Sequence, residues 1–262
     1  MSETTKSRVR FALVTGAARR IGACIAETLH QRGCDVFLHY HNSDVEVKQL
    51  ADRLNALRPA SATVVQADLG VTEDIERLAE HVRARAGQLY LLVNNASKFF
   101  PTAVGSTTMT QWDELMDSNL RGPYFLTQAL LPELTIAGGS VINLLDVHAS
   151  RPMHQHAVYC MAKAGLQMMT LALAKDLGPQ IRVNGIAPGV VDSDMWDEVD
   201  ALFAKYENRP KGEKKRLVGE SVPYGRMGKP EDLTGMAVFL ASADAAYVVA
   251  QTYNVDGGNW MN

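Results

Sequence analysis

Cysteine is scarce in this chain and is placed where it builds no covalent or metal framework. The 262 residues contain three cysteines, Cys24, Cys34 and Cys160, an odd number scattered along the sequence. Zinc sites need cysteine and histidine at short, regular spacings, and disulfide-stapled domains use an even set. The sequence therefore predicts reduced thiols in a cytoplasmic protein and no metal site.

An excess of charge of either sign is also missing. Lys and Arg total 26, Asp and Glu total 29, and the net charge is −3. Strong attraction to nucleic acid or to anionic lipid needs a large positive excess. No apolar run reaches the length of a membrane span, and residues 1–10 lack the apolar core of a secretory signal. We therefore expect no nucleic-acid partner, no membrane and a cytoplasmic location.

Short apolar runs that alternate with helical segments dominate the rest of the chain, which is 47% hydrophobic. A short apolar run that ends at a glycine, such as residues 9–15, is typical of a buried parallel strand. Strands are expected at residues 9–15, 35–40, 62–66, 89–93, 140–145, 181–186 and 252–255. Helices are expected at residues 21–31, 45–57, 72–86, 110–136, 156–177 and 230–240.

The alternation of these elements predicts the fold class. Strands alternating with helices form a parallel sheet that is covered on both faces. The expected fold is α/β, a single doubly wound Rossmann-type parallel sheet of about seven strands flanked by helices. No internal repeat or linker divides the sequence, so residues 1–262 are expected to form one domain. The polar, charged stretch around residues 188–224 is expected to be a substrate-loop region.

A glycine-containing turn, residues 15–22 (TGAARRIG), follows the first expected strand. Gly16 permits a tight turn, and Gly22 lets the next helix pack close to the strand. The free N–H groups of that helix N-terminus attract phosphate. Arg20 stands where the general fingerprint has its middle glycine, and with Arg19 it could bind a phosphate in a charge-assisted fork. The alternative is a plain turn with solvated arginines.

The end of the second expected strand indicates which dinucleotide fits. An acidic residue there would bind the ribose hydroxyls and repel a 2′-phosphate. The segment consists of His39, Tyr40, His41, Asn42 and Ser43, with no carboxylate before residue 44. These hydrogen-bond donors predict NADPH as the cofactor, and exposed loop residues without a ligand are the alternative.

Asp146 precedes a tyrosine and a lysine that lie one helical turn apart, Tyr159 and Lys163. Residues at i and i+4 share a helix face, so the phenol and the ammonium can approach the same point. A nearby ammonium favours the phenolate and brings the phenol closer to working pH, as a general acid requires. Alone the pattern is weak, because an exposed helical pair has the same spacing.

Taken together, the motifs resemble those of the short-chain dehydrogenase/reductase family over residues 9–258. The matching residues are Gly16, Gly22, Asp68, Leu69, Asn94, Asn95, Ala96, Asn119, Tyr159, Lys163, Pro188 and Gly189. Six ordered motifs at compatible spacing are far more specific than any one of them. The resemblance implies a hydride-transferring enzyme in which Asn119 interrupts its helix and helps a water reach Lys163. It also implies a homotetramer, with residues 110–136 and 156–177 as contact surfaces.

Within that family the chain looks most like the pteridine reductases. Arg20 replaces the middle glycine, residues 38–43 resemble their NADPH-selecting strand end, and Asp146 stands where most family members use serine. Ser97 and Phe99 resemble the residues that line the pterin pocket, where Phe99 would stack on the pterin ring. The resemblance implies reduction of a pterin, dihydropterin or dihydrofolate-like substrate. Tyr159 would be the proton donor, and Asp146 would accept hydrogen bonds from the amino and ring N–H groups of the substrate.

The expected site follows from the motifs and the resemblance. Catalysis is assigned to Asp146, Tyr159, Lys163 and Asn119, and substrate binding to Arg20, Ser97, Phe99, Asp146 and Tyr159. The cofactor is expected at Gly16, Arg19, Arg20, Ile21, Gly22, His39, Tyr40, His41, Asn42, Ser43, Asp68, Leu69, Asn95, Ala96, Ser97, Tyr159, Lys163, Pro188 and Gly189.

Two parts of the chain depart from the pteridine reductases and leave the substrate open. Residues 190–196 do not match them closely, and residues 248–260 are also similar to polyol and sugar dehydrogenases of the family. A polyol, sugar or carbonyl substrate is therefore the alternative. A non-catalytic NADPH-binding regulator is a third hypothesis, which intact Asn119, Tyr159 and Lys163 disfavour. His148, His154 and His156 cluster without the carboxylates of a metal site. His154 and His156 are instead expected in the loop that leads to Tyr159, in contact with substrate.

Overall fold

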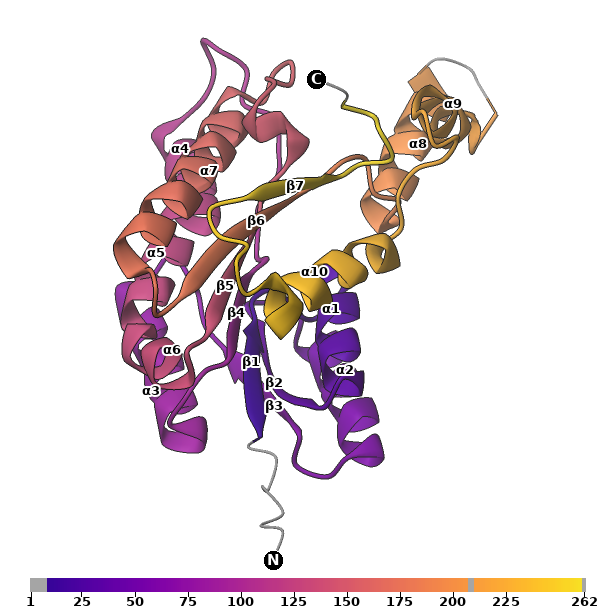
Figure 1. The fold of residues 1–262 in the computed structure, drawn as a ribbon. Coiled ribbons are helices and arrows are strands. Elements are labelled where there is room, and N and C mark those ends of the chain that lie inside the picture. The colour runs from indigo at the N-terminus through magenta and orange to yellow at the C-terminus, as the bar shows by residue number, and fades with distance from the viewer. Residues whose placement is uncertain (1–8, 207–209, 261–262) are drawn as a thin grey trace, which may run out of the picture.

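A parallel sheet of seven strands in the order β3-β2-β1-β4-β5-β6-β7 forms the centre of the protein (Figure 1). The computed structural model describes residues 9–206 and 210–260. The strands are β1 (Arg10–Val14), β2 (Cys34–Tyr40), β3 (Ala62–Gln66), β4 (Leu91–Asn94), β5 (Ser140–Leu144), β6 (Arg182–Pro188) and β7 (Thr252–Val255). The helices of the first half are α1 (Arg20–Gln31), α2 (Asp44–Leu57), α3 (Thr72–Ala86), α4 (Met109–Met116), α5 (Gly122–Ala129) and α6 (Leu131–Ala137). Those of the second half are α7 (Ala157–Leu177), α8 (Asp194–Tyr206), α9 (Glu213–Ser221) and α10 (Thr234–Ala241).

Two apolar layers cover the sheet, one on each face. Buried side chains of α1, α2 and α10 pack on one face, and those of α3, α5, α6 and α7 pack on the other. Figure 1 shows these two groups of helices on opposite sides of the strands. Because alternate side chains of a strand point to opposite faces, consecutive apolar residues such as Leu13 and Val14 belong to different layers. This confirms the doubly wound α/β fold with seven strands.

The strand order reverses direction between β1 and β4, and this reversal positions the site. β1 pairs with β2 on one side and with β4 on the other, both in parallel. The connections that follow β1 and β4 therefore diverge to opposite faces and leave a crevice at the carboxyl ends of the strands. The glycine turn after β1 and the segment of residues 95–97 after β4 lie at this crevice.

The expectation of a single helix over residues 110–136 is wrong, because the segment is interrupted twice. α4 begins at Met109 behind a capping box of Thr108 and Gln111, and a π-helical turn, Asp117–Arg121, follows it. A second break falls at Leu130, before α6, which has a proline in its first turn and ends at Gly138 in the left-handed conformation. A proline lacks the N–H that a continuous helix needs, and a left-handed glycine ends one.

The stretch after Pro188, expected as a polar loop, contains two helices. α8 and α9 pack against each other and lie to one side of the sheet, at the upper right of Figure 1. Ion pairs hold them together, because Lys215 of α9 contacts Asp192 and Asp197. The polar composition that suggested a loop instead forms a charged, solvent-facing helical pair.

One helix, α7, is long and apolar enough to cross a membrane by length and composition alone. Half of its most apolar window is buried inside the protein, where α7 packs on β6 and on the short turn Val147–Ala149. A helix that covers a central sheet has the same composition.

Candidate functional site

The turn between β1 and α1 has a shape that only glycine permits at two positions. Gly16 has φ 62°, a value that glycine adopts freely. A Cβ at Gly22 would lie 2.3 Å from the Gly16 carbonyl oxygen and 2.5 Å from Asn95 Nδ2. Asn95 Nδ2 donates to the Thr15 carbonyl oxygen at 2.8 Å. The turn, the start of α1 and the segment after β4 are therefore packed backbone to backbone.

His39 braces this turn from the neighbouring strand. Its Nδ1 accepts a hydrogen bond from the Gly16 N–H at 3.1 Å, which leaves Nε2 to carry the proton and donate to the Ala67 carbonyl oxygen at 3.1 Å. Burial lowers the pKa of His39 to about 4, so the ring is neutral at pH 7. His39 lines the cofactor cleft as expected, but both of its nitrogens are already used and it offers no donor to a phosphate.

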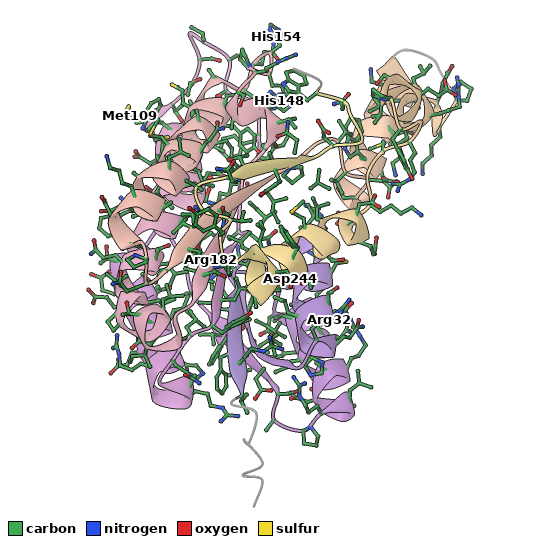
Figure 2. All side chains as sticks on the ribbon, viewed as in Figure 1. Arg32, Met109, His148, His154, Arg182 and Asp244 are labelled. Carbon is green, nitrogen blue, oxygen red and sulfur yellow. The ribbon has the colours of Figure 1, made fainter. Side chains whose placement is uncertain are left out.

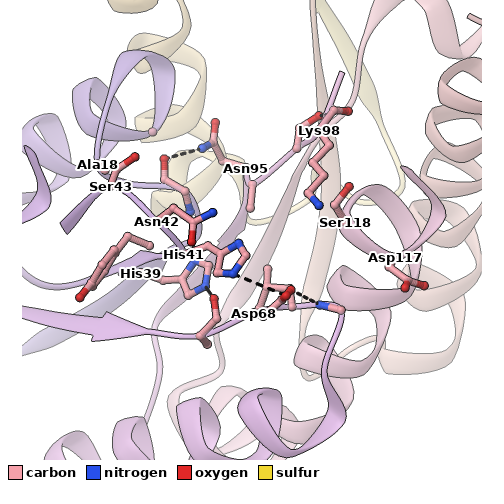
Figure 3. A pocket seen from close by; sticks show the side chains of 18 of the residues that line it. Ala18, His39, His41, Asn42, Ser43, Asp68, Asn95, Lys98, Asp117 and Ser118 are labelled. Carbon is pink, nitrogen blue, oxygen red and sulfur yellow. Dashed lines mark hydrogen bonds and ion pairs between the residues drawn. The ribbon is translucent and has the colours of Figure 1, made fainter. Parts of the chain in front are cut away.

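A cleft of about 730 Å³ opens at this turn. Figure 3 shows His39, His41 and Asn42 on one side of it and Lys98, Ser118 and Asp117 on the other, with Asp68 between them. The expected cofactor residues that line it are Gly16, Arg19, Arg20, Ile21, Gly22, His39, Tyr40, His41, Asn42, Ser43, Asp68, Leu69, Asn95, Ala96 and Ser97. Tyr159, Lys163, Pro188 and Gly189 are not part of its lining.

The end of β2 presents hydrogen-bond donors to this cleft. His41 lies 3.5 Å from an oxygen of Asp68, and Asn42 and Ser43 are its neighbours on the rim. The first carboxylate after the strand, Asp44, is engaged at 2.8 Å by both the Tyr40 hydroxyl and Lys48 Nζ. A glycine cradle at a helix N-terminus fits the phosphates of a nicotinamide dinucleotide, and the strand end beside it supplies hydrogen-bond donors.

The two arginines of the turn face a residue that the sequence did not suggest. Arg20 Nε pairs with Asp194, the first residue of α8, and a guanidinium nitrogen of Arg19 lies 3.9 Å from the same carboxylate. Arg20 adopts φ 55°, an uncommon value for a residue with a Cβ. The expected phosphate ligand Arg20 is therefore tied to the substrate-loop helix in this structure.

Asp146, Tyr159 and Lys163 come together at the carboxyl end of β5 and the start of α7. The Tyr159 hydroxyl donates to Asp146 Oδ2 at 2.7 Å, while Oδ1 accepts from the His148 N–H at 2.8 Å. Lys163 Nζ donates to the Leu144 carbonyl oxygen at 2.9 Å and lies 5.8 Å from the centre of the Tyr159 ring. Tyr159 and Lys163 are buried and Asp146 is half-buried, and its carboxylate contacts the phenol directly.

Burial and the neighbouring charges change the pKa values of Tyr159 and Lys163. Burial first, and then the Asp146 carboxylate, raise the pKa of Tyr159 well above 10. Burial lowers the pKa of Lys163 to about 8, partly opposed by Asp146. The expectation that Lys163 brings the phenol closer to neutrality is therefore wrong for this arrangement. Burial and Asp146 instead keep the proton on Tyr159 at neutral pH, so the phenol is present in its protonated form but is a weaker acid than a free phenol.

Asn119 lies in the π-helical turn, fully buried, where the long helix is interrupted. Its Nδ2 donates to the Leu115 and Lys98 carbonyl oxygens, and its Oδ1 accepts from the Ser97 hydroxyl at 2.6 Å. Ser97 is thereby fixed at the edge of the cofactor cleft. Asn119 ties the segment after β4 to the helix, and the π turn supplies the space for its side chain.

Phe99 lies against Tyr159, but one face of its ring is covered. Its ring stacks on His156 with centroids 4.6 Å apart and planes at 12°. Its centre lies 4.9 Å from that of Tyr159, with the planes at 85°. A flat substrate ring can stack on Phe99 only at the remaining face or by displacing His156.

Pro188 and Gly189 lie at the end of β6, where the chain passes β7. The Gly189 N–H donates to the Val255 carbonyl oxygen, and a Cβ at Gly189 would lie 2.6 Å from that of Asp256. A second, polar cavity of about 180 Å³ adjoins Asp146 nearby. Its polar lining residues include Ser150, Gln167, Thr252, Asn254 and Trp260.

Sequence reasoning missed three groups at the site. The brace by His39 could have been suspected from a histidine inside an apolar strand, since a buried polar group needs partners. The pairing of Asp194 with the phosphate turn and the lining of the second cavity had no sequence signal, because they join segments far apart in the chain.

Two of the three histidines before α7, His148 and His156, contact backbone carbonyl groups through their rings. His148 Nδ1 contacts the Arg151 carbonyl oxygen, and His156 Nδ1 contacts that of His154. Figure 2 shows His148 and His154 at the same end of the molecule. Within residues 9–206 and 210–260, no group of three His, Cys, Asp or Glu side chains is placed to hold a metal ion.

Comparison with known proteins agrees with this geometry at the level of the family. A family model described as enoyl-(acyl carrier protein) reductase matches residues 16–259. Sorbitol dehydrogenase from Cereibacter sphaeroides is 42% identical, over 97% of this chain and 98% of that protein. Galactitol 2-dehydrogenase from Agrobacterium fabrum is 40% identical over 97% and 98%. Pteridine reductase 1 from Leishmania tarentolae is 32% identical over the same shares, so the expected pteridine-reductase subgroup stays a prediction. The chain belongs to the short-chain dehydrogenase/reductase family of oxidoreductases.

Proposed function

We propose that this oxidoreductase interconverts a hydroxyl and a carbonyl group of a polyol or sugar, with NADP(H) as its cofactor. The observation that carries the substrate class is the similarity over nearly the whole chain to a sorbitol and a galactitol dehydrogenase, at 42% and 40% identity. The covered face of Phe99 also supports it, because His156 occupies a surface that a stacked pterin ring would use.

Asp146 suits a substrate that carries several hydroxyl groups. A simple ketone has no donor for this carboxylate, whereas a polyol presents a hydroxyl on the carbon next to the reacting one. Each oxygen of an ionised carboxylate accepts more than one hydrogen bond, so Asp146 can hold Tyr159 and a substrate hydroxyl together. Asp146 therefore distinguishes donor-bearing substrates from plain ketones, and it does not by itself separate polyols from pterins.

Tyr159 handles the proton in this proposal. The nicotinamide of NADP(H), when bound, supplies or accepts the hydride. In the reductive direction the Tyr159 hydroxyl gives its proton to the substrate oxygen, and in the oxidative direction the phenol oxygen takes it back. Lys163, buried beside the ring, offsets the negative charge left on the pair of Tyr159 and Asp146. Because burial and then Asp146 raise the pKa of Tyr159, the phenol carries its proton at neutral pH and has it available for the substrate oxygen.

The preference for NADP(H) over NAD(H) follows from the end of β2. His41, Asn42 and Ser43 offer donors at the rim of the cleft, and Asp44 is engaged by Tyr40 and Lys48. We expect kcat/KM to be at least about tenfold higher with NADPH than with NADH, the equivalent of about 1.4 kcal/mol. Equal values for the two cofactors would refute this part of the proposal.

A substrate panel tests the proposed class. Hexitols with NADP+, the matching ketoses with NADPH, and dihydrobiopterin and dihydrofolate with NADPH are compared by absorbance of the reduced cofactor. Turnover of a hexitol or ketose without turnover of the pterins supports the proposal. Turnover of a pterin without any hexitol or ketose overturns it.

Reduction of a pterin is the second candidate, and the similarity of the chain to a pteridine reductase, at 32% identity, supports it. A carboxylate at this place can read the amino and ring N–H groups of a pterin. The Asp146→Ser variant separates the two candidates. A polyol should lose about ten- to a hundredfold in kcat/KM, because one charged hydrogen bond is lost, whereas pterin turnover should be abolished. Wild-type-like polyol turnover in Asp146→Ser would show that Asp146 does not read the substrate.

We also propose that the protein is a homotetramer. Large apolar side chains of α4, α5 and α7 are exposed, namely Trp112, Tyr124, Phe125, Met161, Met168 and Leu171. Such a set is typical of a subunit contact. Sedimentation at micromolar concentration gives a tetramer if the proposal holds and a monomer if it fails. A cytoplasmic location and a lack of nucleic-acid or membrane partners stay predictions of the sequence.

A further inference from the structure

One ion-paired corner joins the substrate-loop helices to the phosphate turn. Asp194 begins α8, and its two carboxylate oxygens face Arg20 and Arg19. Arg20 and Asp194 are 174 positions apart in the sequence. Both arginines line the cofactor cleft. The carboxylate therefore uses guanidinium groups that belong to the phosphate-binding turn.

A carboxylate and a phosphate oxygen compete for the same guanidinium donors. Both are anions that accept charge-assisted hydrogen bonds from the planar fork of arginine. Arg20 is the first residue of α1, at the helix end that attracts anions. A dinucleotide phosphate placed at this helix end would face Asp194 as a like charge across the two arginines, so both anions cannot keep their full contact.

The two substrate-loop helices, α8 and α9, are held together as one unit by contacts between them. Inside the unit, Lys215 pairs with Asp192 and Asp197, and the Lys215 N–H donates to Asp200. At its base, the Asp192 N–H donates to the Gly228 carbonyl oxygen at 2.8 Å. The unit is thus braced internally and anchored at its base. The contact of Asp194 with the turn ties its front edge to the cofactor site.

We propose that Asp194 is a positioning residue that couples the two binding sites. While no cofactor is bound, its ion pairs with Arg19 and Arg20 hold α8 against the phosphate turn. When the cofactor binds, its phosphate replaces Asp194 at these arginines. Release of α8 then accompanies cofactor binding, so the substrate loop responds to the cofactor before substrate arrives. The inference rests on the proposed binding of NADP(H) and is independent of which substrate is used.

The Asp194→Asn variant tests the competition, with NADPH as the probe. Removing the carboxylate takes the Asp194 partner from Arg20, while Arg19 keeps its ion pair with Glu46 at 3.7 Å. The Kd for NADPH, measured by fluorescence titration without substrate, should therefore fall about fivefold, the scale of one exposed ion pair. Asp197→Asn is the matched control, since it makes the same charge change on the same helix but pairs with Lys215. Its Kd should be unchanged.

Hydrogen exchange gives a second measurement that does not depend on turnover. In the wild type, exchange in residues 190–206 should rise when NADPH binds, and in Asp194→Asn it should already be high without cofactor. An unchanged or raised Kd in Asp194→Asn, or an equal fall in both variants, overturns the inference while leaving the proposed cofactor intact. Failure of the wild type to bind NADPH overturns the cofactor proposal and this inference together.

Discussion

The two halves of the site are built in different ways. The cofactor half consists of the turn after β1 and the ends of β2, β3 and β4, which meet in one cleft of about 730 Å³. The substrate half combines Asp146 and Tyr159 with Phe99 and the α8–α9 unit, all held on loops or helix starts. Backbone shape defines the first half, and side-chain contacts between distant segments define the second.

This difference explains how tightly each half is specified. A methyl group on Gly22 would lie less than 3 Å from two neighbouring groups, and the His39 ring links the Gly16 N–H of the turn to the Ala67 carbonyl oxygen after β3. Such packing leaves one arrangement only. Phe99, by contrast, is 39% exposed and Asp194 is a surface residue, so their contacts can exchange with those of a ligand. Binding of the cofactor is a property of the fold, whereas choice of substrate is a property of a few exchangeable contacts.

Replacing the proton donor should separate the two halves most sharply. Tyr159→Phe removes the hydroxyl that Asp146 holds at 2.7 Å, and kcat should fall by about a thousandfold with any accepted substrate. The Kd for NADPH should change by less than about threefold, because the cofactor cleft does not include this residue. Tyr247→Phe, at a fully exposed tyrosine, is the control. Residual kcat within about tenfold of the wild type would contradict the assigned role.

The buried His39 makes the cofactor half sensitive to acid. Its pKa of about 4 in the folded protein lies below the ordinary value of 6.5. The unfolded chain therefore binds more protons between these values, and the free energy of unfolding should fall by up to about 3 kcal/mol as pH drops from 6.5 to 4. His39→Gln, which keeps an acceptor and a donor, should flatten this slope in urea titrations. His81→Gln, on the exposed face of α3, should leave it unchanged.

If the acid sensitivity is local to the cofactor half, NADPH affinity should decline over the same pH window. Protonation takes away the lone pair of Nδ1 that holds the Gly16 N–H. An equal pH slope in the wild type and in His39→Gln would show that other groups control acid stability.

A methyl group added to the phosphate turn should have the smallest of these effects on stability, yet it should act on one half alone. Gly22→Ala places a Cβ 2.3 Å from the Gly16 carbonyl oxygen, and overpacking of this kind costs about 1–3 kcal/mol. NADPH binding should weaken with it, because the turn must shift. Gly235→Ala, in α10 with no neighbour within 4 Å, is the matched control. Equal melting temperatures for both variants would refute the close packing.

Much of the fold could be predicted from the sequence, and the misses share one cause. Apolar runs bounded by glycine marked all seven strands to within about two residues at most ends. The expected helix at residues 110–136 failed because its apolar spacing continues through a π turn and a break. The spacing of apolar side chains does not indicate where a π-helical turn accommodates Asn119. It also does not indicate where Pro132 lacks the N–H that a continuous helix needs.

The candidate site shows the same division. Tyr159 and Lys163 share a helix face because their spacing is fixed by the helix itself. The direction in which Asp146 shifts the pKa of Tyr159 required the burial and the 2.7 Å contact. The resemblance to pteridine reductases rested on local residues, whereas similarity over the whole chain is greater to the two polyol dehydrogenases.

The sequence by itself determined the doubly wound α/β fold, the place of the phosphate turn and the shared helix face of Tyr159 and Lys163. These features lie within single elements or at strand ends, where local geometry leaves little freedom. Only the tertiary structure decided that His39 braces Gly16, that His156 covers Phe99 and that Asp194 occupies the arginines of the turn. Each of these contacts joins segments whose separation in space depends on the paths of the intervening loops, and no spacing in the sequence encodes it.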